Sequence, residues 1–346
     1  MMFDHGPHNS IADIKGLRVG HAQDAELKSG TTALVCDVDN VASVHVVGGA
    51  PGTRDTDLLA PENTVIGVDA LILSGGSAFG LDACGGAQSA LREMGRGFAV
   101  ADQRVPIVPG AILFDLVNGG DKDWGTHSPY RDLGYQAVKN ASDRVDIGSV
   151  GAGTGALVGG PEAGLKGGLG TASVKFEGIT IAALVAANAL GSPTVGTSPN
   201  FWAAPFEIGN EFGGLGMARE SSAEASALRI KFRETQSQGA NTTIGIIATD
   251  AQLTPGETKR LAVAAHDGFA RALWPAHTPF DGDLIFGLST GGSAIAPPAE
   301  NQIELSALSS STMARAIARG IHAATASPND IFPTWQDRFN GMTAST

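Results

Sequence analysis

Three residues with chemically useful side chains, Asn241-Thr242-Thr243, lie where a polar segment runs into an apolar one. Residues 220–240 read ESSAEASALRIKFRETQSQGA, with scattered charge and few apolar anchors, which predicts an exposed segment. The residues from Thr242 to Thr249, TTIGIIAT, are β-branched and apolar and predict a buried strand. The junction therefore places a hydroxyl at the first position of a core strand, beside a backbone that could be cut without loss of structure.

This arrangement suits an N-terminal nucleophile. The Thr242 hydroxyl would attack the carbonyl carbon of Asn241, the peptide bond would become an ester, and water would release a chain that begins with Thr242. The freed α-amine, whose ordinary pKa is about 7.7–8.0, can then act as the general base for the same hydroxyl. The alternative is that the threonines reflect only the β-propensity of a strand start.

Two carboxylates separated by one glycine, Asp281 and Asp283, precede the strand-like run LIFGLS. Together with His277 or with His266-Asp267 they could bind a divalent cation. One short acidic triplet lacks the number of ligands that a hard cation prefers, and the eight histidines have no metal-ligand spacing. We therefore predict neither a metal site nor a cofactor.

Two further polar residues stand out from apolar or glycine-rich surroundings. Lys166 is the lone lysine of EAGLKGGLG, where the ordinary interpretation is a surface turn. Because this setting offers little to pack, we expect its replacement by alanine to leave the fold nearly intact. Asn188 ends the run ITIAALVAAN before a turn, and asparagine at a strand end is most often a turn residue.

Two glycine motifs call for a decision. GAGTGA from Gly151 fits a dinucleotide fingerprint, but residues 158–170 are too glycine-rich for the helix that this fingerprint requires, so these glycines are expected to form a site wall. GGSAF from Gly75 is one glycine short of a nucleophile elbow. Ser77 is predicted to be a helix N-cap, and the Gly75 and Gly76 amides are possible oxyanion donors.

The elements that must position these residues are short apolar strands between helices. Most predicted strands are continuous apolar runs, so both faces of each sheet should be covered. Helices are predicted over Ser77–Glu93, after the capping box Thr254-Pro255-Gly256-Glu257, and over Ser306–Thr325. These elements predict an α/β fold, a four-layer α-β-β-α sandwich. The predicted strands are Thr31–Asp37, Ala42–Val47, Ala70–Leu73, Arg144–Val150, Thr171–Phe176, Ile179–Ala187, Thr242–Thr249 and Leu284–Ser289.

Composition limits the class of protein. A formal net charge of −12 without a Lys/Arg cluster argues against nucleic acid or an anionic membrane as a partner. No apolar run approaches membrane-spanning length, and two isolated cysteines give no disulfide framework, so we expect a cytoplasmic protein. Residues 1–346 are predicted to form a single catalytic domain that is cleaved into 1–241 and 242–346, with an exposed linker at about 215–241.

Four blocks of the sequence, in order, make the chain similar to the L-aminopeptidase/D-esterase family, which includes β-aminopeptidases and nylon-oligomer hydrolases. The resemblance spans roughly residues 11–325. The blocks are GGAPGTRDTDLL from Gly48, LSGGSAFGLDACGGA from Leu73, GAGTGALVGG from Gly151, and the segment from Asn241 to Gly291 that begins NTTIGIIATDAQLTPGE.

The resemblance implies an N-terminal nucleophile hydrolase fold and cleavage before Thr242 rather than before its neighbour Thr243. It implies that Lys166 lies near the nucleophile and that Asn188 offers its amide to the active site. Asp281 and Asp283 would hold the nucleophile's hydroxyl and free amine. Phe114 departs from the family, because several relatives carry a tyrosine just before the acidic position, so a hydroxyl that assists catalysis elsewhere would be missing.

The activity implied is hydrolysis of small peptides or related amides by a homo-oligomer of cleaved units. Two alternatives stay open at this point. Ornithine acetyltransferases have a similar fold and also use a threonine released by self-cleavage, so the same acyl-enzyme could pass to an amine. A non-catalytic relative that only binds amides is the other alternative, suggested by Phe114.

Overall fold

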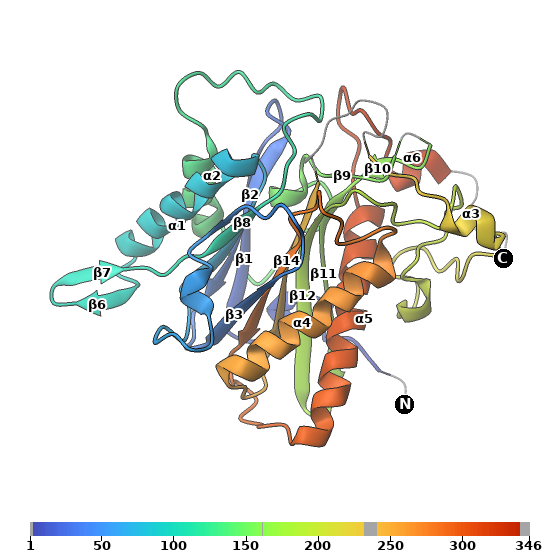
Figure 1. Cartoon of the computed structure of the whole chain (residues 1–346). Helices are drawn as coiled ribbons and strands as arrows, with labels where there is room; N and C mark the ends of the chain where they lie inside the picture. The colour runs from blue at the N-terminus through green and yellow to red at the C-terminus, as the bar shows by residue number, and fades with distance from the viewer. Residues whose placement is uncertain (1–2, 161, 232–240, 340–346) are drawn as a thin grey trace.

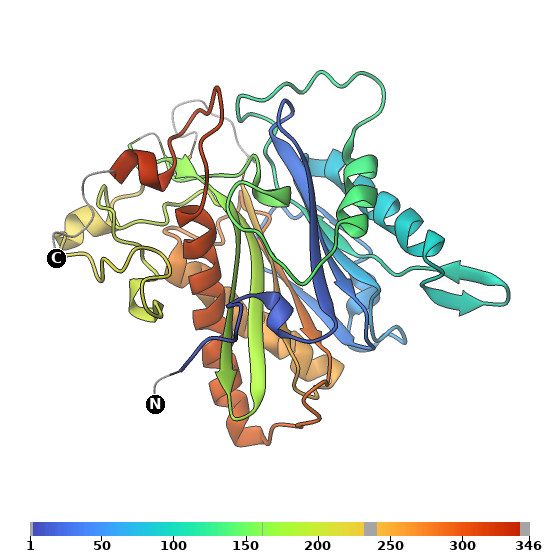
Figure 2. The same cartoon turned by 180° about the vertical axis from the view of Figure 1, so that it is seen from behind.

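The computed structural model describes residues 3–160, 162–231 and 241–339. Two five-stranded sheets stack face to face, and helices cover the outer face of each sheet (Figures 1 and 2). The predicted four-layer α-β-β-α sandwich is confirmed. The order along the first sheet is β1 (Leu17–Asp24), β2 (Ser29–Cys36), β5 (Ala70–Ser74), β8 (Gly110–Ile112) and β4 (Thr53–Arg54).

The second sheet contains the predicted nucleophile strand at its centre. Neighbouring strands are antiparallel except for the parallel pair β13 and β14, and this register places Thr242 opposite Asn188. The order is β11 (Gly168–Phe176), β12 (Ile179–Asn188), β13 (Thr242–Thr249), β14 (Leu284–Ser289) and β3 (Val41–Val46).

Four helices supply the outer layers. α1 (Asp82–Glu93) and α2 (Tyr130–Lys139) pack on the first sheet, whereas α4 (Pro255–Ala272) and α5 (Gln302–His322) pack on the second. The predicted capping box starts α4, because the Thr254 hydroxyl accepts from the Glu257 N–H and the Glu257 carboxylate accepts from the Thr254 N–H. The central core between the sheets is apolar and includes Leu34, Leu184 and Ile246.

Shorter elements complete the chain. They are β6 (Phe98–Val100), β7 (Gln103–Val105), β9 (Leu157–Val158), β10 (Leu165–Lys166), α3 (Ser222–Ser226), α6 (Trp335–Phe339), and the 3₁₀ helices η1 (Ile11–Asp13), η2 (Asp57–Leu59), η3 (Ser77–Leu81), η4 (Gly151–Gly153), η5 (Ala204–Phe206) and η6 (Ala299–Asn301). No helix among the described residues is long and apolar enough to cross a membrane.

The predicted strand Arg144–Val150 is wrong. This segment makes only an isolated bridge to β11, through Gly148 and Leu169, while Ser142 just before it bridges to Val19 of β1. The chain thus touches the first sheet just before this segment and the second sheet within it, and neither contact extends into a ladder.

Two helix starts also differ from their predictions. Gly76, in the left-handed region at φ 85°, caps η3, so Ser77 is the first residue of that helix and not its N-cap. The last long helix begins at Gln302 and ends at His322, rather than spanning Ser306–Thr325.

Candidate active site

The start of β13 and the residues that lead into β14 lie side by side. Asn241 pairs with Asp281 in an isolated parallel bridge, and Asp283 immediately precedes β14. All of β13 is buried, because its apolar side chains pack in both the central core and the layer beneath α4 and α5. The fold thus brings Thr242, Asn188 and the two predicted carboxylates into one region.

The Thr242 hydroxyl lies against the peptide group that precedes it. Its Oγ1 donates a short hydrogen bond to the Asn241 carbonyl oxygen. The Gly282 N–H lies 3.2 Å from both that carbonyl oxygen and Thr242 Oγ1. A donor on a carbonyl oxygen stabilises the negative charge that develops when the carbonyl carbon is attacked.

Gly282 has a steric reason to be glycine. A Cβ atom there would lie 2.6 Å from the Ala50 carbonyl oxygen and 2.7 Å from Thr242 Oγ1. Ala50 lies in the sequence block GGAPGTRDTDLL that begins at Gly48, and its N–H donates to the Asp281 carbonyl oxygen at 2.9 Å. The absence of a side chain therefore lets the Gly282 amide approach the hydroxyl.

The two carboxylates have separate partners. Asp283 Oδ1 accepts from the Thr243 N–H at 2.8 Å, next to the proposed nucleophile. Asp281 Oδ2 accepts from the Thr278 N–H at 2.9 Å and from its hydroxyl at 2.6 Å. Burial raises the pKa of Asp281, and the neighbouring negative charge of Asp283 adds to this rise.

Asn188 lies beside the site, and its side chain is fully engaged. Its Nδ2 donates to the Phe114 carbonyl oxygen at 2.9 Å, and its Oδ1 accepts from the Leu157 N–H at 2.9 Å. Phe114 therefore reaches the site through its backbone. In this arrangement the Asn188 amide has a protein acceptor in place of a reacting oxygen.

Lys231 is a site residue that the sequence interpretation missed. It is buried, with its Nζ 2.6 Å from the Leu157 carbonyl oxygen and 3.1 Å from both the backbone and side-chain oxygens of Asn188. Burial lowers the pKa of Lys231 to about 7, against the opposing effects of the Asp281 and Asp115 charges. A lysine in a polar segment ordinarily predicts a solvated side chain, so no signal in the sequence marked it.

Lys166 is buried, contrary to the surface-turn interpretation. Its Nζ lies 2.8 Å from Asp330 Oδ2, and Lys28 Nζ lies 2.7 Å from the other oxygen of the same carboxylate. Burial by itself would raise the pKa of Asp330, but the hydrogen bonds from the two lysines lower it. Lys166 therefore has more to contact than its glycine-rich setting indicated, and its removal would break a largely buried ion pair.

The candidate oxyanion glycines already have acceptors. The Gly75 N–H donates to the Gly30 carbonyl oxygen at 2.9 Å, and the Gly76 N–H donates to the buried Asp115 carboxylate at 2.7 Å. Gly151 lies beside β1 and β2, since its N–H donates to Gln23 Oε1 at 3.1 Å. The Gly282 amide, and none of these three glycine amides, donates to the Asn241 carbonyl oxygen.

The predicted linker is only partly exposed where it is described. Residues 215–230 are exposed or half-buried apart from Ser222, whose exposure is not described, whereas Lys231 and Asn241 are buried. The predicted exposure of 232–240 falls outside the described residues.

The two candidate hydroxyls differ in their contacts. Thr243 Oγ1 is buried and has no hydrogen-bond partner among the described residues, whereas Thr242 Oγ1 has two.

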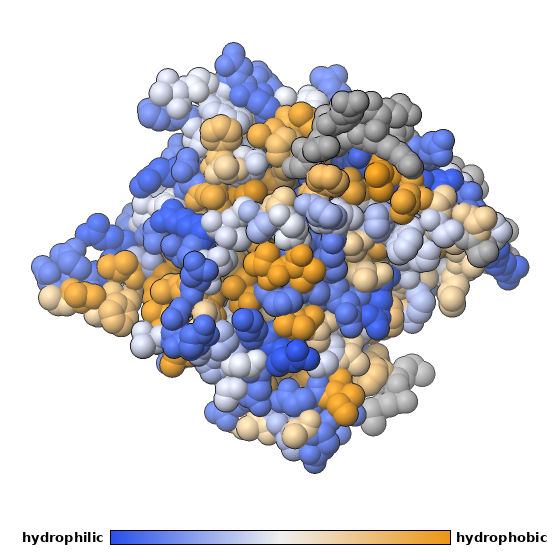
Figure 3. All heavy atoms as spheres, in the orientation of Figure 1, coloured by the Kyte–Doolittle hydropathy of each residue, from blue (hydrophilic) through white to orange (hydrophobic). Residues whose placement is uncertain are grey.

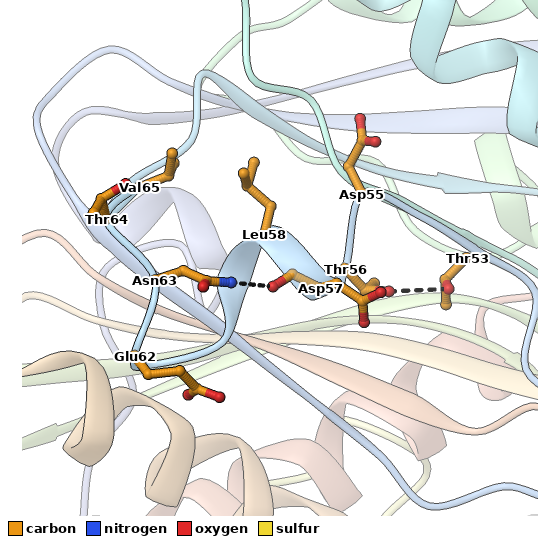
Figure 4. Close-up of a pocket in the computed structure, with 9 residues that line it drawn as sticks. All are labelled: Thr53, Asp55, Thr56, Asp57, Leu58, Glu62, Asn63, Thr64 and Val65. Carbon is orange, nitrogen blue, oxygen red and sulfur yellow. Dashed lines mark hydrogen bonds between the residues drawn. The ribbon is translucent and has the colours of Figure 1, made fainter.

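A separate pocket of about 710 Å³ is lined by residues 53, 55–58 and 62–65 and lies on the loop that follows β4 (Figure 4). Its lining is polar and includes Asp55, Asp57 and Glu62, and the Asn63 amide donates to the Asp57 carbonyl oxygen at 2.7 Å. None of the residues at the β13 start lines this pocket.

Within the described part of the chain, no group of three or more His, Cys, Asp or Glu residues is arranged to hold a metal ion.

Comparisons with known proteins agree on one family. The profile of peptidase family S58 matches residues 9–329. An aminopeptidase of Mycobacterium tuberculosis (strain ATCC 25618 / H37Rv), described as uncharacterized, is 41% identical over 97% of this chain and 100% of its own length. A 6-aminohexanoate-oligomer endohydrolase of Kocuria sp. (strain KY2) is 27% identical, over 80% of this chain and 74% of that protein.

Solved structures support the fold. A β-aminopeptidase of Burkholderia sp. superposes with a TM-score of 0.69 at 20% identity, covering 100% of this chain and 97% of that one. The L-aminopeptidase D-Ala-esterase/amidase of Ochrobactrum anthropi, described as a variant of the Ntn hydrolase fold, gives 0.67 at 22% identity, covering 99% and 97%. The match to peptidase family S58 and the sequence relatives named as an aminopeptidase and an endohydrolase favour neither the acyltransferase nor the non-catalytic alternative.

Proposed function

This chain belongs to peptidase family S58 and is a peptide- or amide-bond hydrolase of the N-terminal nucleophile type, and we propose that Thr242 is its nucleophile. The contact between the Thr242 hydroxyl and the Asn241 carbonyl, with the Gly282 N–H on both oxygens, is the observation that carries the proposal. Thr243 is the weaker candidate, because its backbone rather than its hydroxyl is engaged by a candidate site residue.

In the proposed self-cleavage, Thr242 Oγ1 bonds to the Asn241 carbonyl carbon and the C–N bond to Thr242 breaks. The hydroxyl proton passes to the departing nitrogen, which becomes the α-amine, and Gly282 N–H stabilises the oxyanion. Water then hydrolyses the ester, which leaves a carboxylate on Asn241 and restores the Thr242 hydroxyl.

In the cleaved enzyme the same hydroxyl attacks the substrate carbonyl, and the α-amine takes and returns its proton. Asp283 and Asp281 orient the new N-terminus, and Asn188 and Lys231 supply polar groups beside it. The role of Lys166 near the nucleophile stays a prediction, since its ammonium is bound to Asp330.

The proposed substrates are small peptides or related amides from which an N-terminal residue is released, in keeping with the names of the relatives. A panel of aminoacyl-nitroanilides, β-peptides and aliphatic amide oligomers would identify the class that is turned over. Turnover in which an added amine acceptor outcompetes water would instead favour acyl transfer. We also propose a cytoplasmic location, supported by two buried free cysteines and checked by cell fractionation.

Denaturing mass spectrometry tests the nucleophile. The wild-type chain should yield fragments 1–241 and 242–346, and Thr242→Ala should leave one folded, intact chain without hydrolase activity, because the hydroxyl needed for both reactions is gone. Thr243→Ala is the matched control and should still cleave, since the backbone N–H that binds Asp283 remains. An active wild-type protein that stays a single chain, or a C-terminal fragment that begins at Thr243, would refute the assignment.

A further inference from the structure

Asp283 has a second partner that the proposed mechanism does not use. Its Oδ1 faces the start of β13, but its Oδ2 accepts from the backbone N–H of His277 at 3.2 Å and lies 2.8 Å from His277 Nδ1. The carboxylate is buried, and the imidazole side chain is 18% exposed. One histidine therefore holds the oxygen that faces away from the nucleophile strand.

The other ring nitrogen of His277 also faces an acceptor. His277 Nε2 lies 3.2 Å from the His266 carbonyl oxygen, which can only accept a hydrogen bond. An ionised carboxylate likewise only accepts. Both contacts are hydrogen bonds at once only when the ring carries two protons, so this geometry selects the imidazolium form of His277.

The surroundings hold the ring in this place. The His277 backbone lies in the left-handed region at φ 55°, and its ring stacks on Phe269 with centroids 5.5 Å apart. The titratable groups that face it are Asp283 and Asp281 from the lead-in to β14, His266 on α4 and His45 on β3.

The balance of these groups favours the cation. Burial alone would lower the pKa of His277, but the bond to Asp283 and its negative charge raise the pKa above its ordinary value. Burial lowers the pKa of the adjacent His266 to about 3, so that ring is neutral and adds no competing charge. Its Nε2 lies 3.0 Å from the His45 carbonyl oxygen, away from the carboxylate.

We infer that His277 is a positioning residue of the nucleophile site: it fixes Asp283 through two hydrogen bonds and, as an imidazolium ion, balances the charge of that carboxylate. This inference rests on the proposed function, in which the Thr242 α-amine, one residue before the amide bound by Asp283, must be neutral to act as a base. An unbalanced carboxylate would favour the ammonium form of that amine, and the imidazolium counteracts this effect.

The sharpest variant is His277→Asn. Asparagine places an N–H donor close to the position of Nδ1 and tolerates a left-handed backbone, so the hydrogen bond to Asp283 is kept while the charge is lost. His266→Gln is the matched control, because glutamine can keep the bond to the His45 carbonyl oxygen and the ring it replaces does not contact Asp283.

The readout is the pH dependence of kcat/KM for the cleaved proteins. We expect the acidic limb, which reports deprotonation of the Thr242 amine, to move to higher pH by about one unit in His277→Asn. On that limb kcat/KM would be about tenfold lower than in the wild type. The limb of His266→Gln should stay at the wild-type pH. An unshifted limb in a cleaved His277→Asn enzyme would overturn the inference, because a merely structural histidine predicts that result.

A second measurement does not need activity. In the uncleaved Thr242→Ala chain, an NMR titration should give the His277 ring a pKa above its ordinary value of about 6.5. Adding Asp283→Asn to the same chain should return the pKa of His277 to that ordinary value. An ordinary pKa for His277 in both chains would overturn the ion pair. This result does not depend on whether the His277→Asn variant folds or cleaves. If the wild-type chain never cleaves, the proposed function fails, and this titration still decides the His277–Asp283 pair.

Discussion

At the scale of single residues, Gly282 provides the contact on which the proposed chemistry depends most directly. Its N–H lies 3.2 Å from the Asn241 carbonyl oxygen, and any side chain would displace it from Thr242 Oγ1. Removal of one oxyanion donor typically costs on the order of 10²–10³ in rate. We therefore expect Gly282→Ala to slow self-cleavage by roughly that factor, as followed by a mass-spectrometric time course of newly made protein.

Gly256, near the start of α4, is the control for this change, since a Cβ atom there would meet nothing within 4 Å. Gly256→Ala should cleave at the wild-type rate. Wild-type kinetics in Gly282→Ala would show that this amide is not the donor for the reaction.

Some residues of the candidate site could be predicted from the sequence, and others could not, for physical reasons. Thr242, Asn188, Asp281 and Asp283 end or begin apolar runs, so their side chains mark the edge of a sheet. Backbone donors such as the Gly282 N–H carry no side-chain signature. A buried lysine such as Lys231 depends on carbonyl oxygens from distant segments, which sequence patterns do not reveal.

At the scale of elements, the described residues that follow α3 bring Lys231 beside Asn188. The folded chain disfavours the charged form of this lysine, whose pKa is lowered from 10.5 to about 7, so the unfolded chain binds more protons between these two pH values. Stability should therefore rise as the pH increases from about 7 toward 10. Urea denaturation of the uncleaved Thr242→Ala chain at pH 7 and pH 9 should show this rise.

The same titration in Thr242→Ala/Lys231→Met gives the comparison. Methionine keeps an unbranched apolar side chain of similar length without a proton to lose. The rise in the urea midpoint between the two pH values should shrink in the double variant. Equal rises in both chains would mean that Lys231 is not the group that titrates.

Strands and helices were predictable where one pattern dominated. β13 and β14 are uninterrupted apolar runs between polar turns, and α4 begins with a capping box, so their limits match or nearly match the prediction. β1 was missed because Gly20, His21 and Gln23 interrupt its apolar residues. The strand prediction for residues 144–150 was wrong because strand propensity does not show whether a neighbouring strand has unpaired backbone groups to bond with.

At the scale of the whole molecule, the proposed cut lies in the middle of a shared sheet. β12 and β3 belong to fragment 1–241, whereas β13 and β14 between them belong to 242–346. Burial of each large apolar side chain contributes roughly 1.5–3 kcal/mol, and the central core draws such side chains from both fragments. We expect native mass spectrometry to find both fragments in one particle, and separate particles under native conditions would contradict this.

The same spectrum tests the proposed homo-oligomer. The β6–β7 hairpin projects from the first sheet, with Phe98, Val100 and Val105 each more than half exposed, and it lies at the left end of the surface in Figure 3. Exposed apolar side chains of this kind favour association. Masses at multiples of one pair of fragments would support assembly, and a mass equal to a single pair would refute it.

The central position of β13 has a consequence for what happens after denaturation. An uncut chain refolds within one molecule, and its recovery does not depend on how dilute it is. Once the backbone is severed at Thr242, the interior strand of the second sheet must be inserted by a separate polypeptide, so recovery becomes a meeting of two molecules and falls with dilution. The uncut precursor would thus fold with a covalent link between the two fragments, and self-cleavage would then remove that link. The mature enzyme would stay folded because it unfolds slowly.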